Sequence, residues 1–290
     1  MITQRNGALS SSNNCAPVVI QHAPSIFPIE SRREKVEPHS TMEMLWLEIT
    51  QRCNLDCIHC YADSGYNRSL AESMRFEDWI STLHQAFELG CCKVQFTGGE
   101  PLMVPYIQDL VVKASQIGYE HIEVFTNGTL LSHQLRTTLQ KLPITLAFSI
   151  YSSQDVIHDT ITRTKGSFKK TIEAISWAVK ANFQVQASVI GMKINSHDIE
   201  HTVSFLRGLG VGNIALDKVR AAGRGILLTE EKTPFRDSCK NCFLKKLCID
   251  ASGRVLPCIF SRSHALGHIS DGLQNLCGPA TRQNSTIKIH

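Results

Sequence analysis

Three cysteines lie close together in one short stretch of the sequence, and cysteine thiolates are strong metal ligands. The stretch runs Cys53-Asn-Leu-Asp-Cys57-Ile-His-Cys60, with the spacing C-x3-C-x2-C, directly after an apolar run at 45–49. Thiolates select zinc, copper(I) or iron–sulfur clusters. A tetrahedral zinc ion needs a fourth ligand, for which His59 is a candidate. Three cysteines suit a four-iron cluster better, because each binds one iron and the last iron stays open to another ligand.

From Met44 onward, short strand-like runs alternate with longer helical runs, and these elements must position the cysteines. Such alternation predicts a parallel sheet with right-handed crossovers and helices outside. Six units are fewer than the eight of a closed barrel, so we expect an open partial (β/α)6 barrel of the TIM type. The expected strands are 45–50, 93–97, 121–126, 144–150, 184–190 and 213–217. The expected helices lie around 80–87, 107–111, 131–142, 168–179 and 199–206, and the glycines placed to end helices are Gly90, Gly118 and Gly208 or Gly210.

Polar and glycine-rich segments follow these strands. Ligands of parallel sheets bind at the carboxyl ends of the strands, so these segments are expected to form one site. The cysteines follow the first strand, and Thr97-Gly98-Gly99-Glu100-Pro101 follows the second. The later segments are Thr126-Asn127-Gly128, then Ser149 and Tyr151, then Asp217 and Arg220 with Gly223-Arg224-Gly225.

The cysteine spacing and the Gly98-Gly99-Glu100 segment together resemble the radical S-adenosylmethionine (radical SAM) superfamily, over about residues 46–258. The resemblance implies a [4Fe–4S] cluster held by Cys53, Cys57 and Cys60, with S-adenosylmethionine (SAM) on its open iron. Reductive cleavage of SAM would then yield a 5′-deoxyadenosyl radical, which abstracts hydrogen from a substrate. The SAM-binding residues that the resemblance implies are His59, Tyr61, Gly98, Gly99, Glu100, Asn127, Ser149 and Arg163. Arg163 could equally be a solvated loop charge.

A second group of cysteines lies near the C-terminus. A tight Cys-x2-Cys loop and a turn at Ser252-Gly253 could bring several thiols together on a small β unit. This stretch resembles the auxiliary-cluster extension of SPASM and twitch enzymes, and a structural zinc ribbon is the alternative. The five cysteines are too few for two fully ligated clusters, so one auxiliary [4Fe–4S] cluster is expected. The surest ligands are Cys239, Cys242 and Cys258, with either Cys248 or Cys277 as the fourth.

Composition and domain organisation set the remaining bounds. The 290 residues divide into an extended arm at 1–41, a barrel at 42–230 and a cysteine-rich extension at 231–290. Apolar residues make up 42% and charged residues 19%, as in ordinary soluble proteins. The net charge of +4 is weak and spread along the chain, so no nucleic-acid partner is expected.

Two further patterns bear on location. No apolar run reaches membrane-spanning length and no secretory signal begins the chain, so we expect a cytoplasmic protein without a membrane partner. In a reducing compartment, 11 cysteines indicate metal ligands or buried thiols rather than disulfides. Cys15, Cys91 and Cys92 stand apart from both groups and are expected to be structural.

The resemblance also implies a class of reaction. The segments 149–159 and 217–225 look most like those of peptide maturases. A ribosomally made precursor peptide is therefore the favoured substrate, modified by crosslinking, epimerisation, excision or thioether formation. A separate peptide-recognition protein and an electron donor such as flavodoxin or ferredoxin are further expected partners. The alternatives are a radical SAM enzyme that acts on a small molecule or tetrapyrrole, and a non-catalytic iron–sulfur or zinc protein.

Overall fold

The computed structural model describes residues 42–66, 72–229 and 245–278. All of these residues belong to one compact unit that spans 39–290. The predicted arm at 1–41 lies outside the described residues. None of the helices in the described ranges is both long enough and apolar enough to cross a membrane.

A nine-stranded sheet organises this unit, in the order β6-β5-β4-β3-β2-β1-β7-β8-β9. The first six strands pair in parallel, with Leu45 of β1 opposite Val94 of β2, and the sheet remains open, which confirms the predicted partial barrel. Every predicted strand boundary lies within two residues of the observed one. The strands are β1 (Met44–Glu48), β2 (Lys93–Thr97), β3 (His121–Thr126), β4 (Thr145–Ser149), β5 (Gln184–Gly191) and β6 (Asn213–Lys218).

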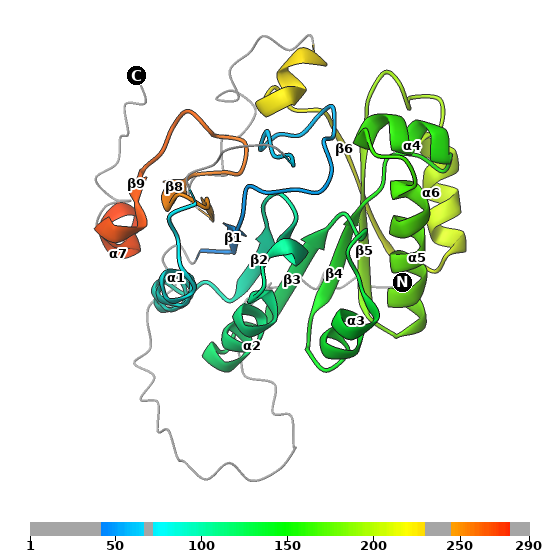
Figure 1. Ribbon diagram of the computed structural model, residues 1–290. Coiled ribbons are helices and arrows are strands. Elements are labelled where there is room, and N and C mark those ends of the chain that lie inside the picture. The colour runs from blue at the N-terminus through cyan, green and yellow to red at the C-terminus, as the bar shows by residue number, and fades with distance from the viewer. Residues whose placement is uncertain (1–41, 67–71, 230–244, 279–290) are drawn as a thin grey trace, which may run out of the picture. The chain divides into compact units, whose positions relative to one another are not determined.

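Helices lie along the outside of this curved sheet (Figure 1). One of them, α4, was not predicted, because it is short and its apolar Val156 faces solvent. Gly90, Gly118 and Gly210 adopt positive φ after α1, α2 and α6, whereas Gly208 is the last residue of α6. The helices are α1 (Phe76–Glu88), α2 (Ile107–Ile117), α3 (His133–Leu139), α4 (Asp155–Thr162), α5 (Ser167–Lys180) and α6 (Ile199–Gly208), with short 3-10 turns η1 (Pro101–Met103) and η2 (Gly223–Leu227).

Side chains alternate between the two faces of the sheet, as the pleat of a strand requires. In β1, Leu45 and Leu47 belong to the apolar core beneath the helices, whereas Trp46 lines a cavity on the opposite face. In β5, Gln186 and Ser188 likewise face the cavity. The helix-facing residues thus hold the fold together, while the alternate positions are available for a site.

The C-terminal residues continue the same sheet. Strand β7 pairs in parallel with β1, and β8 and β9 follow as antiparallel strands. Figure 1 shows β8, β9 and α7 at the end of the sheet opposite β6. The division at 230/231 falls outside the described residues and stays a prediction. The C-terminal elements are β7 (Lys246–Ile249), β8 (Arg254–Leu256), β9 (Gly267–His268), η5 (Ile269–Asp271) and α7 (Leu273–Cys277).

A buried ion pair fastens the C-terminal loop to β1. Glu48, at the end of β1, is 1% exposed and accepts hydrogen bonds from both terminal nitrogens of Arg262, one of them at 2.7 Å. The Arg262 guanidinium also lies over the ring of Tyr61, 5.2 Å from its centroid. Because Tyr61 follows the third cysteine, the pair links the C-terminal loop to the predicted site.

Arg262→Ala should destabilise the folded chain by about 3–5 kcal/mol near neutral pH, because it leaves Glu48 as an unpaired buried carboxylate. Urea denaturation measures this loss. Burial raises the pKa of Glu48 despite the neighbouring Arg262. Without the arginine that pKa rises further, so the deficit should shrink as the pH falls and Glu48 takes up a proton.

The matched control is Lys245→Ala, which removes an exposed ion pair with Glu43 (Nζ–Oε1 2.5 Å). It should cost less than about 1 kcal/mol. Equal stability of the two variants would contradict a supporting role for the Arg262–Glu48 pair.

Candidate active site

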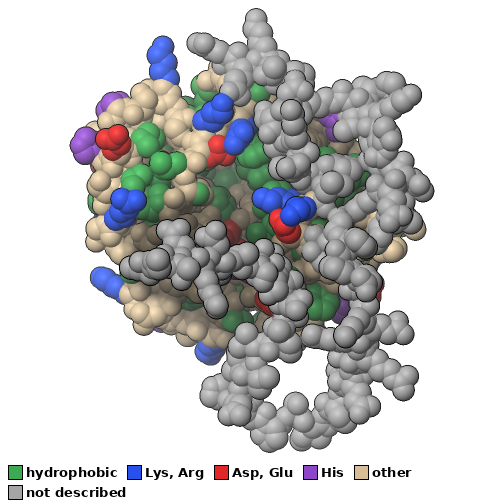
Figure 2. Space-filling view, turned by 180° about the vertical axis from the view of Figure 1, so that it is seen from behind, with side chains coloured by type: hydrophobic (Ala, Val, Ile, Leu, Met, Phe, Trp, Pro, Cys, Tyr) green, Lys and Arg blue, Asp and Glu red, His purple; other side chains and the backbone are tan. Residues whose placement is uncertain are grey.

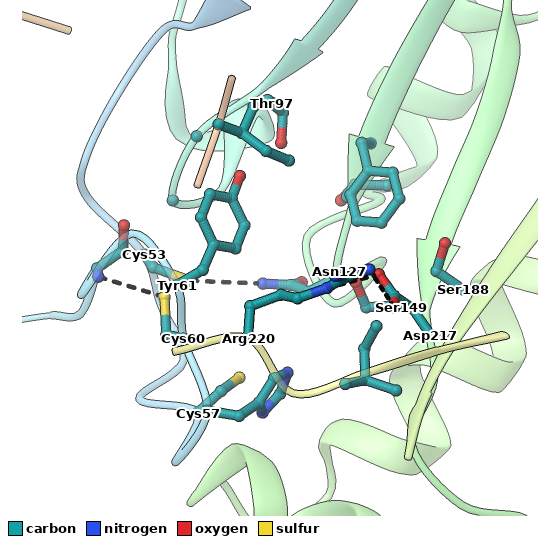
Figure 3. A pocket seen from close by; sticks show the side chains of 18 of the residues that line it. Cys53, Cys57, Cys60, Tyr61, Thr97, Asn127, Ser149, Ser188, Asp217 and Arg220 are labelled. Carbon is teal, nitrogen blue, oxygen red and sulfur yellow. Dashed lines mark hydrogen bonds and ion pairs between the residues drawn. The ribbon is translucent and has the colours of Figure 1, made fainter. Parts of the chain in front are cut away.

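A cavity of about 350 Å³ opens at the carboxyl ends of the strands. In Figure 2, apolar side chains are visible in a hollow of the surface with charged side chains at its edge. Figure 3 shows the three cysteines on one side of the cavity and Ser149, Ser188 and Asp217 on the other. The predicted site residues that line it are Cys53, Cys57, Cys60, His59, Tyr61, Gly98, Gly99, Asn127 and Ser149.

The cysteine loop (residues 50–64) is held on one side by the end of α4. The backbone N–H of Ile58 donates to the carbonyl oxygen of Ile161 (2.9 Å), and that of Asp56 donates to Thr162 (3.2 Å). Arg163, the next residue, forms an ion pair with the Asp56 side chain (3.1 Å) and does not line the cavity. Its predicted contact with SAM stays a prediction; in this structure Arg163 supports the loop.

The three thiols fit a cluster better than a single metal ion. Burial raises the pKa of Cys53 to about 12, and the Glu100 carboxylate adds to the effect. Burial and the charges of Cys60 and Cys53 also raise the pKa of Cys57, so both thiols need a bound cation to ionise. Three thiolates suit a four-iron cluster, because each can bind a different iron.

Two polar atoms beside the thiols are buried without a hydrogen-bond partner among the described residues. They are Nδ1 of His59 and Oγ of Ser64, and both residues line the cavity. Burial, and after it the positive charge of Arg224, lowers the pKa of His59 to about 4. The imidazole is therefore neutral at pH 7 and packs edge-on against Tyr151 (4.6 Å between centroids). Unpartnered buried polar atoms are costly, which fits a cavity built to receive a polar ligand.

The glycine-rich segment lies directly against the start of the cysteine loop. The backbone N–H of Gly99 donates to Thr50 (2.7 Å), and that of Glu100 donates to Arg52 (2.8 Å). A Cβ atom on Gly99 would overlap the carbonyl oxygen of Arg52, and one on Gly98 would overlap that of Thr50. The adjacent glycines, expected from the sequence to admit a ligand, are thus also required by backbone-to-backbone packing.

Glu100 is fully buried and lies outside the residues that line the cavity. Its carboxylate accepts hydrogen bonds from the Thr126 hydroxyl (2.6 Å) and from the backbone N–H groups of Asn127 (2.8 Å) and Leu102 (3.1 Å). Burial raises the pKa of Glu100 to about 7, although these three donors act in the opposite direction. The structure therefore gives this carboxylate partners within the protein, and its predicted contact with SAM stays a prediction.

Asn127 connects the loop after β3 to the cysteine loop. Its amide nitrogen donates to Oδ1 of Asn54 (2.9 Å) and lies 3.9 Å from the sulfur of Cys53. Its carbonyl oxygen accepts a hydrogen bond from Thr171 of α5 (2.8 Å). Glu100 thus helps to fix the backbone of Asn127, whose side chain reaches the cysteine loop.

The far side of the cavity carries polar groups from β5 and β6. Arg220 forms an ion pair with Asp217 (2.6 Å) and lies over the Phe260 ring, 5.5 Å from its centroid. Gln186 and Ser188 also line this side and were not predicted as site residues. Their signal is a polar residue at every second position of an otherwise apolar strand.

The described C-terminal cysteines lie on opposite faces of the sheet. Cys248 pairs with Trp46 in register, so it faces the cavity side, where it is buried. Cys277 instead belongs to the core beneath the helices, and its thiol donates to the carbonyl oxygen of Leu273 (3.0 Å). Cys239 and Cys242 lie outside the described residues, and so does Cys15. Cys91 is a fully buried core residue, as expected of a structural thiol.

Known proteins resemble more than half of this chain. "Sporulation killing factor maturation protein SkfB" of Bacillus subtilis (strain 168) is 28% identical over 186 residues, which are 61% of this chain and 43% of SkfB. GTP 3′,8-cyclase of Petrotoga mobilis is 33% identical over 172 residues, which are 57% of this chain and 52% of the cyclase. The chain spans about half the length of these curated relatives.

Solved structures share the fold. Streptococcus suis SuiB bound to its precursor peptide SuiA superposes with a TM-score of 0.62 at 16% identity, over 76% of this chain and 60% of SuiB. The model of the Radical SAM superfamily matches residues 47–206, more than half of the 290 residues. The match contains the cysteine loop and the glycine-rich segment. The chain therefore belongs to the radical SAM superfamily, as its cysteine spacing predicted.

Proposed function

We propose that this chain is a radical SAM enzyme that modifies a ribosomally made peptide. The observation that carries the proposal is that Cys53, Cys57 and Cys60 line one cavity together with Gly98 and Gly99. A [4Fe–4S] cluster on these thiols, with SAM bound to it, would supply the electron that cleaves SAM to a 5′-deoxyadenosyl radical. Incubation of the iron-loaded protein with SAM and dithionite tests the proposal. A lack of 5′-deoxyadenosine from the fully loaded protein would instead favour a non-catalytic iron–sulfur or zinc protein.

The chain's own residues would bind and orient these groups. The three thiolates hold the cluster, and the unpartnered polar atoms of His59 and Ser64 are available to the nucleoside part of SAM. The ring of Tyr61 packs against Phe260 (5.3 Å between centroids), and both line the cavity. Apolar walls of this kind exclude water and protect a reactive species from side reactions.

A peptide is the substrate that the relatives support best. SkfB is named as a maturation protein, and SuiB was solved with a precursor peptide. The far side of the cavity offers Gln186, Ser188 and Arg220, whose donors and acceptors match the polar groups of a peptide backbone. A small molecule is the second candidate, supported by the 33% identity to GTP 3′,8-cyclase. Turnover with a short precursor peptide but not with a nucleotide would distinguish the two.

An auxiliary [4Fe–4S] cluster and two partner proteins complete the proposal. We assign Cys239, Cys242, Cys258 and Cys248 as the auxiliary ligands. Cys248 is preferred to Cys277 because Cys248 faces the cavity side of the sheet, whereas Cys277 lies in the opposite core. Reduction needs an electron donor such as flavodoxin or ferredoxin, and a separate peptide-recognition protein would deliver the precursor.

Each of Cys53→Ala, Cys57→Ala and Cys60→Ala should abolish cleavage of SAM, because no neighbouring thiol can replace a lost ligand. Chromatography of 5′-deoxyadenosine measures the loss. Cys91→Ala is the control, since Cys91 is a buried thiol that belongs to the core and does not line the cavity. Cleavage at the wild-type rate by any of the three variants would refute the assignment.

Glu100→Ala should weaken SAM binding at least about tenfold while the cluster keeps its iron. The variant loses three hydrogen bonds to a buried carboxylate, each worth about 1.5–3 kcal/mol. The backbone N–H of Asn127 then loses its acceptor, whereas the backbone bond from residue 100 to Arg52 does not depend on the side chain. Equilibrium dialysis with SAM and an iron assay measure the two effects. Loss of iron would mean that Glu100 supports the cysteine loop rather than SAM.

The wild-type chain should hold about eight irons, and replacement of Cys239 and Cys242 together should leave about four. Cys248→Ala should lower the auxiliary occupancy, whereas its counterpart Cys277→Ala should keep about eight. Anaerobic iron and sulfide assays provide the counts. About four irons per wild-type chain, or one zinc per chain, would overturn the two-cluster model and favour the alternative of a structural zinc ribbon.

A further inference from the structure

The segment that follows β6 packs directly against the backbone of the cysteine loop. The backbone N–H of Arg224, in η2, donates to the carbonyl oxygen of Cys60 (2.9 Å). Gly223 has a φ of +51°, and a Cβ atom there would overlap the carbonyl oxygens of Cys60 and Tyr61. Any side chain at this position would push the two backbones apart, so the contact depends on the glycine.

The Arg224 guanidinium then binds the cysteine loop at several points. Its Nε donates to the carbonyl oxygen of Cys57 (2.8 Å), and Nη2 donates to that of Ser64 (2.7 Å). It also forms ion pairs with Asp63 (3.0 Å) and Asp56 (3.3 Å). A guanidinium presents its five N–H groups in one rigid plane. This single side chain therefore fixes the backbone on both sides of the second and third cysteines.

The same group is a buried positive charge beside the thiols. Arg224 is 10% exposed, whereas its partners Asp56 and Asp63 are 46% and 45% exposed, so solvent screens their charges more strongly. In a poorly solvated region, a cation favours the more negative of two redox states of a nearby cluster. The side chain of Arg52, the neighbour of Cys53, is 70% exposed, so solvent screens its charge and its effect on the cluster is weaker.

We propose that Arg224 is a positioning residue for the cluster: its N–H groups set the spacing of Cys57 and Cys60, and its charge eases reduction of the cluster they bind. The inference rests on the proposed function, because it assumes a cluster on these thiols. Two substitutions separate the hydrogen-bonding role of the Arg224 side chain from the effect of its charge. Lysine keeps the charge but cannot reproduce the planar set of contacts, and glutamine removes the charge.

The experiment compares wild type, Arg224→Lys, Arg224→Gln and the control Arg52→Gln after anaerobic iron loading. Redox titration followed by electron paramagnetic resonance measures the reduction potential, and iron release to a chelator measures how firmly the cluster is held. Cys239 and Cys242 are replaced in all four proteins, including the wild-type reference, so that only the first cluster is observed. We expect the Arg224→Gln cluster to be about tenfold harder to reduce, a shift of about 59 mV for one electron.

Both Arg224 variants should release iron faster than wild type, whereas Arg224→Lys and Arg52→Gln should keep the wild-type potential. Wild-type release rates in both Arg224 variants would overturn the positioning role, and an unchanged potential in Arg224→Gln would overturn the electrostatic one. If Arg224→Gln takes up no iron, Arg224→Lys alone tests the proposal. Iron release from Arg224→Lys at the wild-type rate would then overturn it. A wild-type chain that binds no cluster on Cys53, Cys57 and Cys60 would instead refute the proposed function.

Discussion

The cysteine loop contains no helix or strand, so its shape depends on hydrogen bonds that other segments make to its backbone. The glycine-rich segment after β2 binds the start of the loop, the end of α4 binds its middle, and Arg224 binds its end. Backbone groups that leave water must find partners, and these segments supply them. These segments follow β2, β4 and β6, so the shape of the loop depends on parts of the barrel that are distant in the sequence.

Backbone packing also explains why glycine occurs on both sides of this loop. Gly99 faces the carbonyl oxygen of Arg52, and Gly223 faces that of Cys60. Both contacts join protein backbone to protein backbone, so the protein itself constrains the shape of the loop. Preorganisation of this kind lowers the free-energy cost of ordering the thiols when the cluster assembles. The same residues can still approach SAM, because Gly98 and Gly99 also line the cavity.

The strands and the segments that follow them at the cavity could be predicted from the sequence. The hydrogen-bond and ion-pair partners of each side chain could not. Buried parallel strands read as short apolar runs, which is why all six were predicted. Helix α4 was not predicted, because an eight-residue helix with one exposed apolar residue shows little hydrophobic periodicity. Glu100 and Arg163 lie near the site, as expected, yet they bind Asn127 and Asp56. Such pairings join residues distant in the chain, and spacing alone does not reveal them.

The pairing of β7 with β1 was likewise invisible in the sequence, and it changes how the C-terminal segment should be understood. Without this segment, β1 would expose an unpaired edge, and Glu48 would lose its counterion. Phe260 packs against Tyr61 beside the cysteines and lies under Arg220 from the opposite side of the cavity. The described C-terminal residues therefore complete both the sheet and the lining of the cavity. Because Ile259 and Phe260 line the cavity together with barrel residues, changes in the C-terminal loop would alter the shape of the cavity without replacing the thiols.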